Sequence, residues 1–210
     1  MSSSYKIFYK NVIRRLEITG SIAPSSRFLA EAITRCVCPG DGPLRILEAG
    51  PGTGPFTRFL AAKIRPIDRL DLCELNEEFV HYLQGLLVTD PLLQRRASQI
   101  TIYHQLVQTL LGEKKYDFII SGLPLNNFPH EMVEEILESF QRLLKSGGKL
   151  AFFEYFMVRK IKSSFFYGRA GERMKKRNAI LKRHLDAHES HQIFVALNFP
   201  PSVVHVCEYN

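Results

Sequence analysis

The 210-residue chain lacks the features that would place it among membrane-spanning, secreted or disulfide-stabilised proteins. No apolar run reaches the ~18 residues that a membrane-spanning helix needs. The first ten residues, MSSSYKIFYK, lack the charged-then-apolar order of a secretion signal. Four cysteines occur without a repeating spacing, which is typical of reduced thiols rather than of a disulfide framework or a zinc site. We therefore expect a single cytoplasmic domain with no metal site and no obligate protein partner.

Acidic residues are scarce in two segments, and these segments dominate the net charge of +7. The N-terminal segment includes residues 5–16, where apolar and basic side chains fall on opposite faces of a helix. The second segment, residues 159–183, carries ten basic side chains and one acidic one. Both suit an anionic partner, either a nucleic acid or a lipid surface. We divide the chain into residues 1–26, a basic amphipathic helix with a cofactor-site loop, and residues 27–210, one domain with a basic insertion at about 157–183.

Apolar runs and helical patterns alternate along the chain, which predicts an α/β fold with a mostly parallel seven-stranded sheet and helices on both faces. A short connection joins the last two strands, so we expect an antiparallel pair at one edge of the sheet. The Ser-Gly-Gly sequence at 146–148 is predicted to end the helix before the fifth strand. The strands are predicted at 44–50, 69–75, 99–105, 117–121, 150–156, 192–197 and 203–206, and the main helices at 27–35, 55–64, 77–87, 130–144 and 172–185.

Three glycines at alternate positions follow the first predicted strand, in the sequence EAGPGTG at 48–54. Glycine there allows the backbone to turn tightly and to approach a ligand at the carboxyl edge of the sheet. The spacing differs from the G-x-G-x-x-G of dinucleotide binders. Glu74 ends the second strand, where a carboxylate can accept both hydroxyl groups of a ribose. These features predict a ligand that has a nucleoside but no pyrophosphate, and S-adenosylmethionine is such a ligand. A dinucleotide-binding site and a purely structural turn remain the alternatives.

The order of the Glu48–Gly54 loop, Glu74 and the segment DFIISGLP at 117–124 resembles that of class I S-adenosylmethionine-dependent methyltransferases. More narrowly, the chain is similar to the soluble bacterial phospholipid N-methyltransferases, which methylate phosphatidylethanolamine. IAPSSR at 22–27, SGLP at 121–124 and NFPPSV at 198–203 carry the narrower resemblance. The resemblance spans nearly the whole chain and implies a Rossmann-like fold with S-adenosylmethionine as cofactor.

The resemblance also implies roles for individual residues. The SGLP loop would face the acceptor amine, so Ser121, Gly122 and Leu123 are candidate catalytic residues, together with Tyr9. Such families usually carry an acidic residue after the third strand that meets the adenine amino group, and here Gln105 or a backbone group must serve instead. The implied cofactor-binding residues are Ser26, Glu48, Gly50, Pro51, Gly52, Thr53, Gly54, Glu74, Leu75 and Gln105.

Two acceptors compete within this superfamily, the amine of phosphatidylethanolamine and N6 of an adenine in ribosomal RNA. Adenine methyltransferases carry an Asn-Leu-Pro-Tyr type of loop after the fourth strand, whose aromatic ring stacks on the flipped base. The loop SGLPL at 121–125 lacks both the Asn and the aromatic residue, so a base would lose a stacking contact of ~1–3 kcal/mol. Phe128, further along, is the aromatic residue that could substitute. We therefore expect a phospholipid substrate at the inner face of the cytoplasmic membrane, and keep RNA as the alternative.

The expected reaction is a direct displacement in which a neutral amine attacks the sulfonium methyl group, so the amine must first lose a proton. Glu154 and Tyr155 at the end of the fifth strand, like Tyr9, are candidates for the general base. A degenerate methyltransferase fold that only binds a membrane or RNA is a third possibility, because the usual acid near Gln105 is missing.

Overall fold

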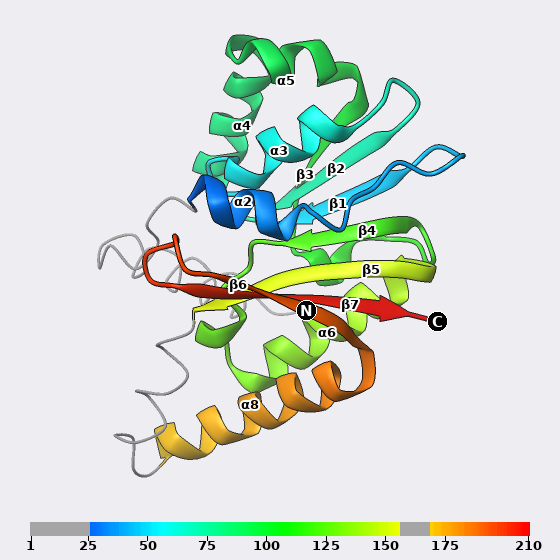
Figure 1. Ribbon diagram of the computed structural model, residues 1–210. Coiled ribbons are helices and arrows are strands. Elements are labelled where there is room, and N and C mark those ends of the chain that lie inside the picture. Colours follow the sequence, from blue (N-terminus) through cyan, green and yellow to red (C-terminus); the bar gives the residue numbers. More distant parts are fainter. Residues whose placement is uncertain (1–25, 156–168) are drawn as a thin grey trace.

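The computed structural model describes residues 26–155 and 169–210 (Figure 1). The helix expected at 5–16, with Tyr9, lies outside the described residues, as does the part of the basic insertion before residue 169. The remainder of the predicted domain, including every other candidate site residue, is described.

The strands form one seven-stranded sheet of order β3-β2-β1-β4-β5-β7-β6. The first five strands in the chain are parallel to one another, and β7 pairs with β5 and with β6 in the antiparallel sense. The predicted mostly parallel sheet with an antiparallel edge pair is thus confirmed. The strand bounds are β1 (Arg45–Ala49), β2 (Arg69–Glu74), β3 (Ile100–His104), β4 (Tyr116–Ser121), β5 (Leu144–Tyr155), β6 (Glu189–Val195) and β7 (Ser202–Tyr209).

Helices cover both faces of the sheet, as the alternating pattern predicts (Figure 1). Successive side chains of a strand point to opposite faces, so Ile46 belongs to one hydrophobic cluster and Leu47 to the other. The Ile46 face is covered by α2 (Arg27–Ile33), α3 (Pro55–Lys63), α4 (Glu77–Thr89) and α5 (Pro91–Arg96). The Leu47 face is covered by α6 (His130–Leu143) and α8 (Arg169–His188). Three short 3₁₀ helices complete the description: η1 (Ala97–Gln99), η2 (Val107–Thr109) and η3 (Leu125–Asn127).

The loops that follow β1, β2, β3 and β4 meet at one edge of the sheet, because parallel strands have their carboxyl ends on the same side (Figure 1). The β6–β7 connection lies at this edge too, since Ser202, the first residue of β7, pairs with Tyr155, the last residue of β5. We call this edge, where the candidate site residues gather, the carboxyl edge.

The predicted boundary between the helix at 130–144 and the fifth strand is wrong. Helix α6 ends at Leu143, and β5 begins directly at Leu144, so Ser-Gly-Gly at 146–148 lies inside the strand. The register between β4 and β5 shifts there: Tyr116 pairs with Leu144, but Phe118 pairs with Lys149. Gly147 has a φ of 74°, and a Cβ on Gly148 would lie 2.7 Å from the carbonyl oxygen of Lys145. The glycines therefore form a bulge in β5 rather than a helix cap.

Candidate active site

The glycine loop after β1 is bonded to the end of β2. The backbone N–H of Gly50 donates to the carbonyl oxygen of Cys73 over 2.9 Å, and that of Gly52 donates to Glu74 Oε2 over 3.1 Å. Gly50 and Gly52 both have a positive φ, 72° and 55°, which an L side chain adopts only with strain. Among the described residues, no heavy atom lies within 4 Å of a Cβ added at Gly52. The loop thus presents bare backbone with open space above Gly52.

Glu74 is held in place by three backbone N–H groups. Besides Gly52, its Oε1 accepts hydrogen bonds from the N–H groups of Leu75 and Asn76, both over 2.8 Å. Glu74 is only 2% exposed, and this burial raises the pKa of its carboxyl group although the three N–H groups counteract the rise. Each carboxylate oxygen can accept more than one bond, so hydroxyl groups of a ribose could still be received.

Glu48 lies beneath the glycine loop and is fully buried. Its Oε2 accepts a hydrogen bond from the Thr57 hydroxyl over 2.7 Å, while Oε1 has no hydrogen-bond partner among the described residues. Burial raises the pKa of Glu48 to about 8. The carboxyl group therefore keeps its proton to a higher pH than an exposed glutamate does, and its Oε1 is available to a polar ligand group.

The folded protein should become less stable between pH 4.5 and 8 because of Glu48. Its pKa is near 4.5 in an unfolded chain and about 8 in the folded one, so in this window the folded state binds the extra proton. Each pH unit then lowers the unfolding free energy by up to about 1.4 kcal/mol. Glu48→Gln, which stays neutral, should flatten this slope in urea denaturation at pH 5, 6, 7 and 8. The exposed Glu138→Gln is the control, and an unchanged slope in Glu48→Gln would assign the effect elsewhere.

The SGLP loop after β4 touches the glycine loop. The backbone N–H of Gly122 donates to the carbonyl oxygen of Ala49 over 2.8 Å, and that of Leu123 to the Ser121 hydroxyl over 3.3 Å. A Cβ added at Gly122 would lie only 2.5 Å from the carbonyl oxygen of Gly50. Position 122 therefore requires glycine for the close approach of two backbones. The contact brings the three described candidate catalytic residues next to Gly50.

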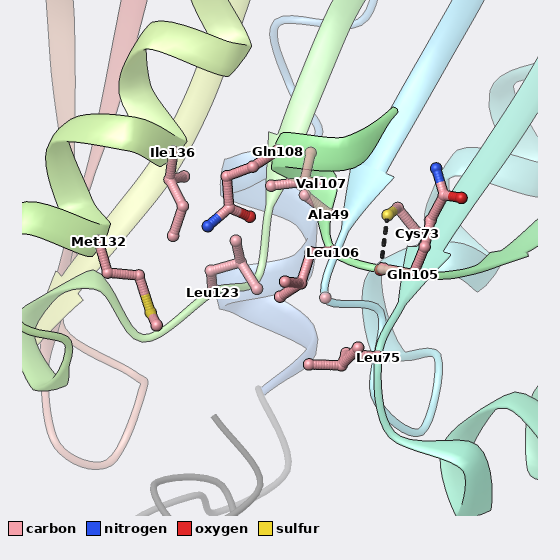
Figure 2. A pocket seen from close by; sticks show the side chains of 11 residues that line it. Ala49, Cys73, Leu75, Gln105, Leu106, Val107, Gln108, Leu123, Met132 and Ile136 are labelled. Carbon is pink, nitrogen blue, oxygen red and sulfur yellow. Dashed lines mark hydrogen bonds between the residues drawn. The ribbon is translucent and has the colours of Figure 1, made fainter. Parts of the chain in front are cut away.

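A largely apolar pocket opens between these loops (Figure 2). Of the predicted cofactor residues, Gly50, Leu75 and Gln105 line it, as does the candidate catalytic residue Leu123. The two glutamines that line it point in different directions: the amide of Gln105 points away from Leu123, whereas the amide of Gln108 points in among the apolar side chains. The lining is completed by Ala49, Cys73, Leu106, Val107, Gln108, Met132 and Ile136.

Gln108 is the site residue that sequence reasoning missed. Its Oε1 is buried and has no hydrogen-bond partner among the described residues. The side chain enters the pocket because η2 follows β3 and turns the chain back toward α6. No short-range pattern distinguishes Gln108 from Gln105, so this orientation could be known only from the structure. The backbone carbonyl of Gln105 accepts from the Cys73 thiol over 3.2 Å.

The other predicted residues lie around the pocket. Pro51, Thr53 and Gly54 complete the glycine loop, with Pro51 and Gly54 buried and Thr53 exposed. The Ser26 hydroxyl caps α2 by accepting from the N–H of Leu29, and the Ser26 N–H donates to Asn198 Oδ1 over 3.1 Å. Ser26 thus ties the start of α2 to the β6–β7 connection.

Of the two described candidates for the general base, Glu154 is part of a buried network. Its Oε2 lies 3.3 Å from Nε2 of His205, whose Nδ1 contacts Glu189. Burial works to lower the pKa of His205, but the hydrogen bonds to the two glutamates raise it overall. Burial raises the pKa of the Tyr155 hydroxyl.

The histidines of α8 contact an aromatic residue. His188 stacks on Tyr209 with 4.4 Å between ring centroids, and Nε2 of His184 lies 2.7 Å from the Tyr209 hydroxyl. Within residues 26–155 and 169–210, no three or more His, Cys, Asp or Glu side chains are grouped to hold a metal ion. In the same ranges, no helix has the length and apolar character that crossing a membrane requires.

These residues fit S-adenosylmethionine. Glu74 offers a fixed carboxylate for ribose hydroxyls, and the apolar pocket beside it suits the faces of an adenine ring. Glu48 Oε1 is a buried polar atom without a hydrogen-bond partner among the described residues, and no described atom lies within 4 Å of a Cβ added at Gly52, which leaves room there for a ligand. The sheet order and this loop arrangement define a class I methyltransferase, whose cofactor is S-adenosylmethionine.

The family is shown by comparison with known proteins. The chain matches the family described as "Methyltransferase domain" over residues 22–196, and it belongs to this family. It is 27% identical over 128 residues to an ornithine lipid N-methyltransferase of Singulisphaera acidiphila, covering 61% of this chain and 66% of that protein. It is 29% identical over 120 residues to a tRNA1(Val) (adenine(37)-N6)-methyltransferase of Dyadobacter fermentans, covering 50% of this chain and 48% of that protein. The chain thus spans between about half and two thirds of these relatives.

Solved structures share the fold. A putative O-methyltransferase from Klebsiella pneumoniae superposes with a TM-score of 0.62, covering 96% of this chain and 89% of that one. The two chains are 14% identical, so the likeness concerns the fold alone. This structural similarity agrees with the predicted Rossmann-like architecture.

Proposed function

We propose that the protein transfers methyl groups from S-adenosylmethionine to the amine of phosphatidylethanolamine at a membrane surface. The observation that carries this proposal is the loop after β4. It has Ser121 where adenine methyltransferases have an amide, and its first aromatic residue, Phe128, is 2% exposed and part of the hydrophobic core. Phe128 therefore offers no stacking surface to a flipped adenine, whereas a small ethanolamine headgroup requires none.

The curated relatives support a nitrogen acceptor of one of two kinds. The Singulisphaera protein is named for N-methylation of ornithine lipid, which favours an amino lipid. The Dyadobacter protein is named for N6-methylation of a tRNA adenine and keeps RNA as the second candidate, although its match covers less of this chain. The geometry of the SGLP loop favours the amino lipid over the RNA adenine.

When bound, S-adenosylmethionine supplies an electrophilic methyl group on a sulfonium sulfur. The residues of this chain hold and align the partners: Glu74 and the glycine loop bind the nucleoside, and the SGLP loop receives the amine. Carbonyl oxygens of the SGLP loop can accept the N–H hydrogens of the acceptor as its nitrogen becomes positive. Proximity and alignment alone can supply ~7–11 kcal/mol. The contact between Gly122 and the Ala49 carbonyl, which fixes one loop against the other, is thus central to the reaction.

A cationic surface near the carboxyl edge supports a membrane as the place of reaction. Three exposed side chains of α8, Arg173, Lys175 and Lys176, form no ion pair with any described residue. They belong to the half of α8 that lies toward the carboxyl edge, while Lys182 and Arg183 in the other half pair with Asp186 and Glu134 (Figure 1). Each Lys or Arg near an anionic leaflet contributes about 1 kcal/mol before screening. We therefore propose a peripheral association with the membrane through this surface.

The function is tested by following a labelled methyl group. The purified protein is incubated with methyl-labelled S-adenosylmethionine and either vesicles of phosphatidylethanolamine and phosphatidylglycerol or deproteinised ribosomal and transfer RNA. Organic extraction then separates lipid from RNA. We expect the label in the organic phase, on methylated phosphatidylethanolamine, and at least tenfold less in RNA.

The control for this assay is Glu74→Ala, which should label neither phase if the chemistry depends on this cofactor site. Label in N6-methyladenine with none in lipid would overturn the lipid proposal. Label in neither phase, together with tight cofactor binding by calorimetry, would exclude both proposed acceptors.

A further inference from the structure

The β6–β7 connection, residues 196–201, carries two of the most exposed apolar side chains of the described residues. Leu197 is 68% exposed and Phe199 is 88% exposed. The connection lies at the carboxyl edge, because Ser202 pairs with Tyr155 at the end of β5 (Figure 1). Exposed apolar side chains that gather in one place can mark an interaction surface, whereas single scattered ones need no explanation.

A buried polar side chain fixes the conformation of this connection, which we call the β6–β7 tip. Asn198, between the two apolar residues, is 6% exposed and uses both ends of its amide. Its Nδ2 donates to the carbonyl oxygen of Pro200 and to the hydroxyl of Ser202, both over 2.9 Å, and its Oδ1 accepts from the N–H of Ser26. With Asn198 held inward, its neighbours Leu197 and Phe199 are left pointing outward. The hydrogen bonds of Asn198 thus fix a turn in which Leu197 and Phe199 are exposed.

The hydrogen bond from the Ser26 N–H to Asn198 joins the tip to the cofactor side of the molecule. Ser26 is the N-cap of α2, whose first turn also exposes Phe28 at 43%. A surface that engages the tip therefore lies beside the carboxyl edge, where the SGLP loop and the pocket open. The N-terminal half of α8, which carries the unpaired cations Arg173, Lys175 and Lys176, lies toward this same edge (Figure 1).

We propose that the β6–β7 tip inserts Leu197 and Phe199 into the headgroup region of a lipid bilayer and so turns the pocket toward the membrane. The inference rests on the proposed lipid function. Exposed apolar side chains and cations on the same edge of the molecule complement an anionic bilayer, whose interface takes up both. A protein partner would also bury apolar residues, but it gives no reason for three cations that pair with no described acid. Insertion beside the site would bring the lipid amine to the SGLP loop without removing the lipid from the bilayer.

The absence of tryptophan from this chain allows a direct test. Phe199→Trp introduces a single fluorescent reporter at the tip. With vesicles of phosphatidylethanolamine and phosphatidylglycerol, we expect its emission to shift to the blue and to be quenched by lipids brominated on the acyl chain. Leu111→Trp is the matched control, because Leu111 is 86% exposed in the loop before β4, at the opposite edge of the sheet. It should neither shift nor be quenched.

Two double variants measure how much Leu197 and Phe199 contribute to vesicle binding. Leu197→Ser with Phe199→Ser should lower the partition onto these vesicles at least about tenfold, as expected from two lost apolar insertions. Val88→Ser with Leu111→Ser, equally exposed at 68% and 86%, should leave it unchanged. Cofactor affinity measured by calorimetry should be the same in both pairs.

The outcomes separate this inference from the proposed function. Lipid methylation with an unquenched reporter at position 199 would overturn the insertion and leave the function standing. Label in RNA alone, with no vesicle response, would overturn both. A blue shift caused by RNA or by a second copy of the chain, in place of vesicles, would show that another partner covers the tip and would also overturn the insertion.

Discussion

Replacing Gly122 with alanine should destabilise the protein and disable the cofactor site together. The added Cβ would lie 2.5 Å from the carbonyl oxygen of Gly50, and a backbone atom cannot move aside as a flexible side chain can. Overpacking of this kind costs about 1–3 kcal/mol. For a domain of this size the upper value lowers Tm by roughly 6–12 °C. Because relief of the clash must push the SGLP loop away from the glycine loop, we also expect cofactor affinity to fall at least about tenfold.

Gly85→Ala is the matched control for this substitution. Gly85 lies within α4, and a Cβ there would have no heavy atom of residues 26–155 or 169–210 within 4 Å. Alanine favours a helix over glycine by about 1 kcal/mol, so Tm should rise and cofactor affinity should be unchanged. Thermal unfolding followed by circular dichroism and calorimetry with S-adenosylmethionine measure both quantities. If Gly122→Ala kept the stability and the affinity of the unmodified protein, the contact between the two loops would have no role in either.

The sheet could be predicted because its strands are short apolar runs bounded by clear breaks. Runs such as Arg45–Ala49 and Tyr116–Ser121 need no information from elsewhere in the chain to be identified as buried strands. Glu74 was identifiable for the same reason, since it directly ends the second run. What the pattern could not give was α5, which begins at Pro91 with Asp90 as its cap. A helix of six residues is too short for its apolar periodicity to be recognised in the sequence.

Long-range contacts decide the parts of the site that could not be predicted. The orientation of Gln108 depends on η2 and on the packing of α6 against it. Phe128 is buried because η3 turns the chain after Leu125 into the core, and its distance from the SGLP loop in sequence gives no hint of this. From sequence, Gly147 and Gly148 predict a helix cap because caps and bulges share a preference for glycine, and only the strand pairing shows that they form a bulge.

Replacing Glu74 with glutamine should weaken S-adenosylmethionine binding roughly 100-fold, since two charge-assisted hydrogen bonds of about 1.5 kcal/mol each are lost from the nucleoside. The change also strains the empty site. One carboxylate oxygen accepts from Leu75 and Asn76 and the other from Gly52, so in either orientation the amide NH₂ faces an N–H donor. We expect the glycine loop to loosen and the unfolding free energy to fall by about 1–3 kcal/mol.

Calorimetric titration with S-adenosylmethionine at constant pH measures this loss, and Glu78→Gln, an exposed glutamate four residues further on, is the control that should bind as the unmodified protein does. The comparison with methyl transfer is decisive for the role of Glu74. If Glu74 acts only through the nucleoside, a saturating concentration of cofactor should restore most of the rate in Glu74→Gln. A rate that stays low at saturation would mean that Glu74 also aligns the glycine loop through Gly52, and affinity retained within a factor of three would remove the carboxylate from the cofactor site altogether.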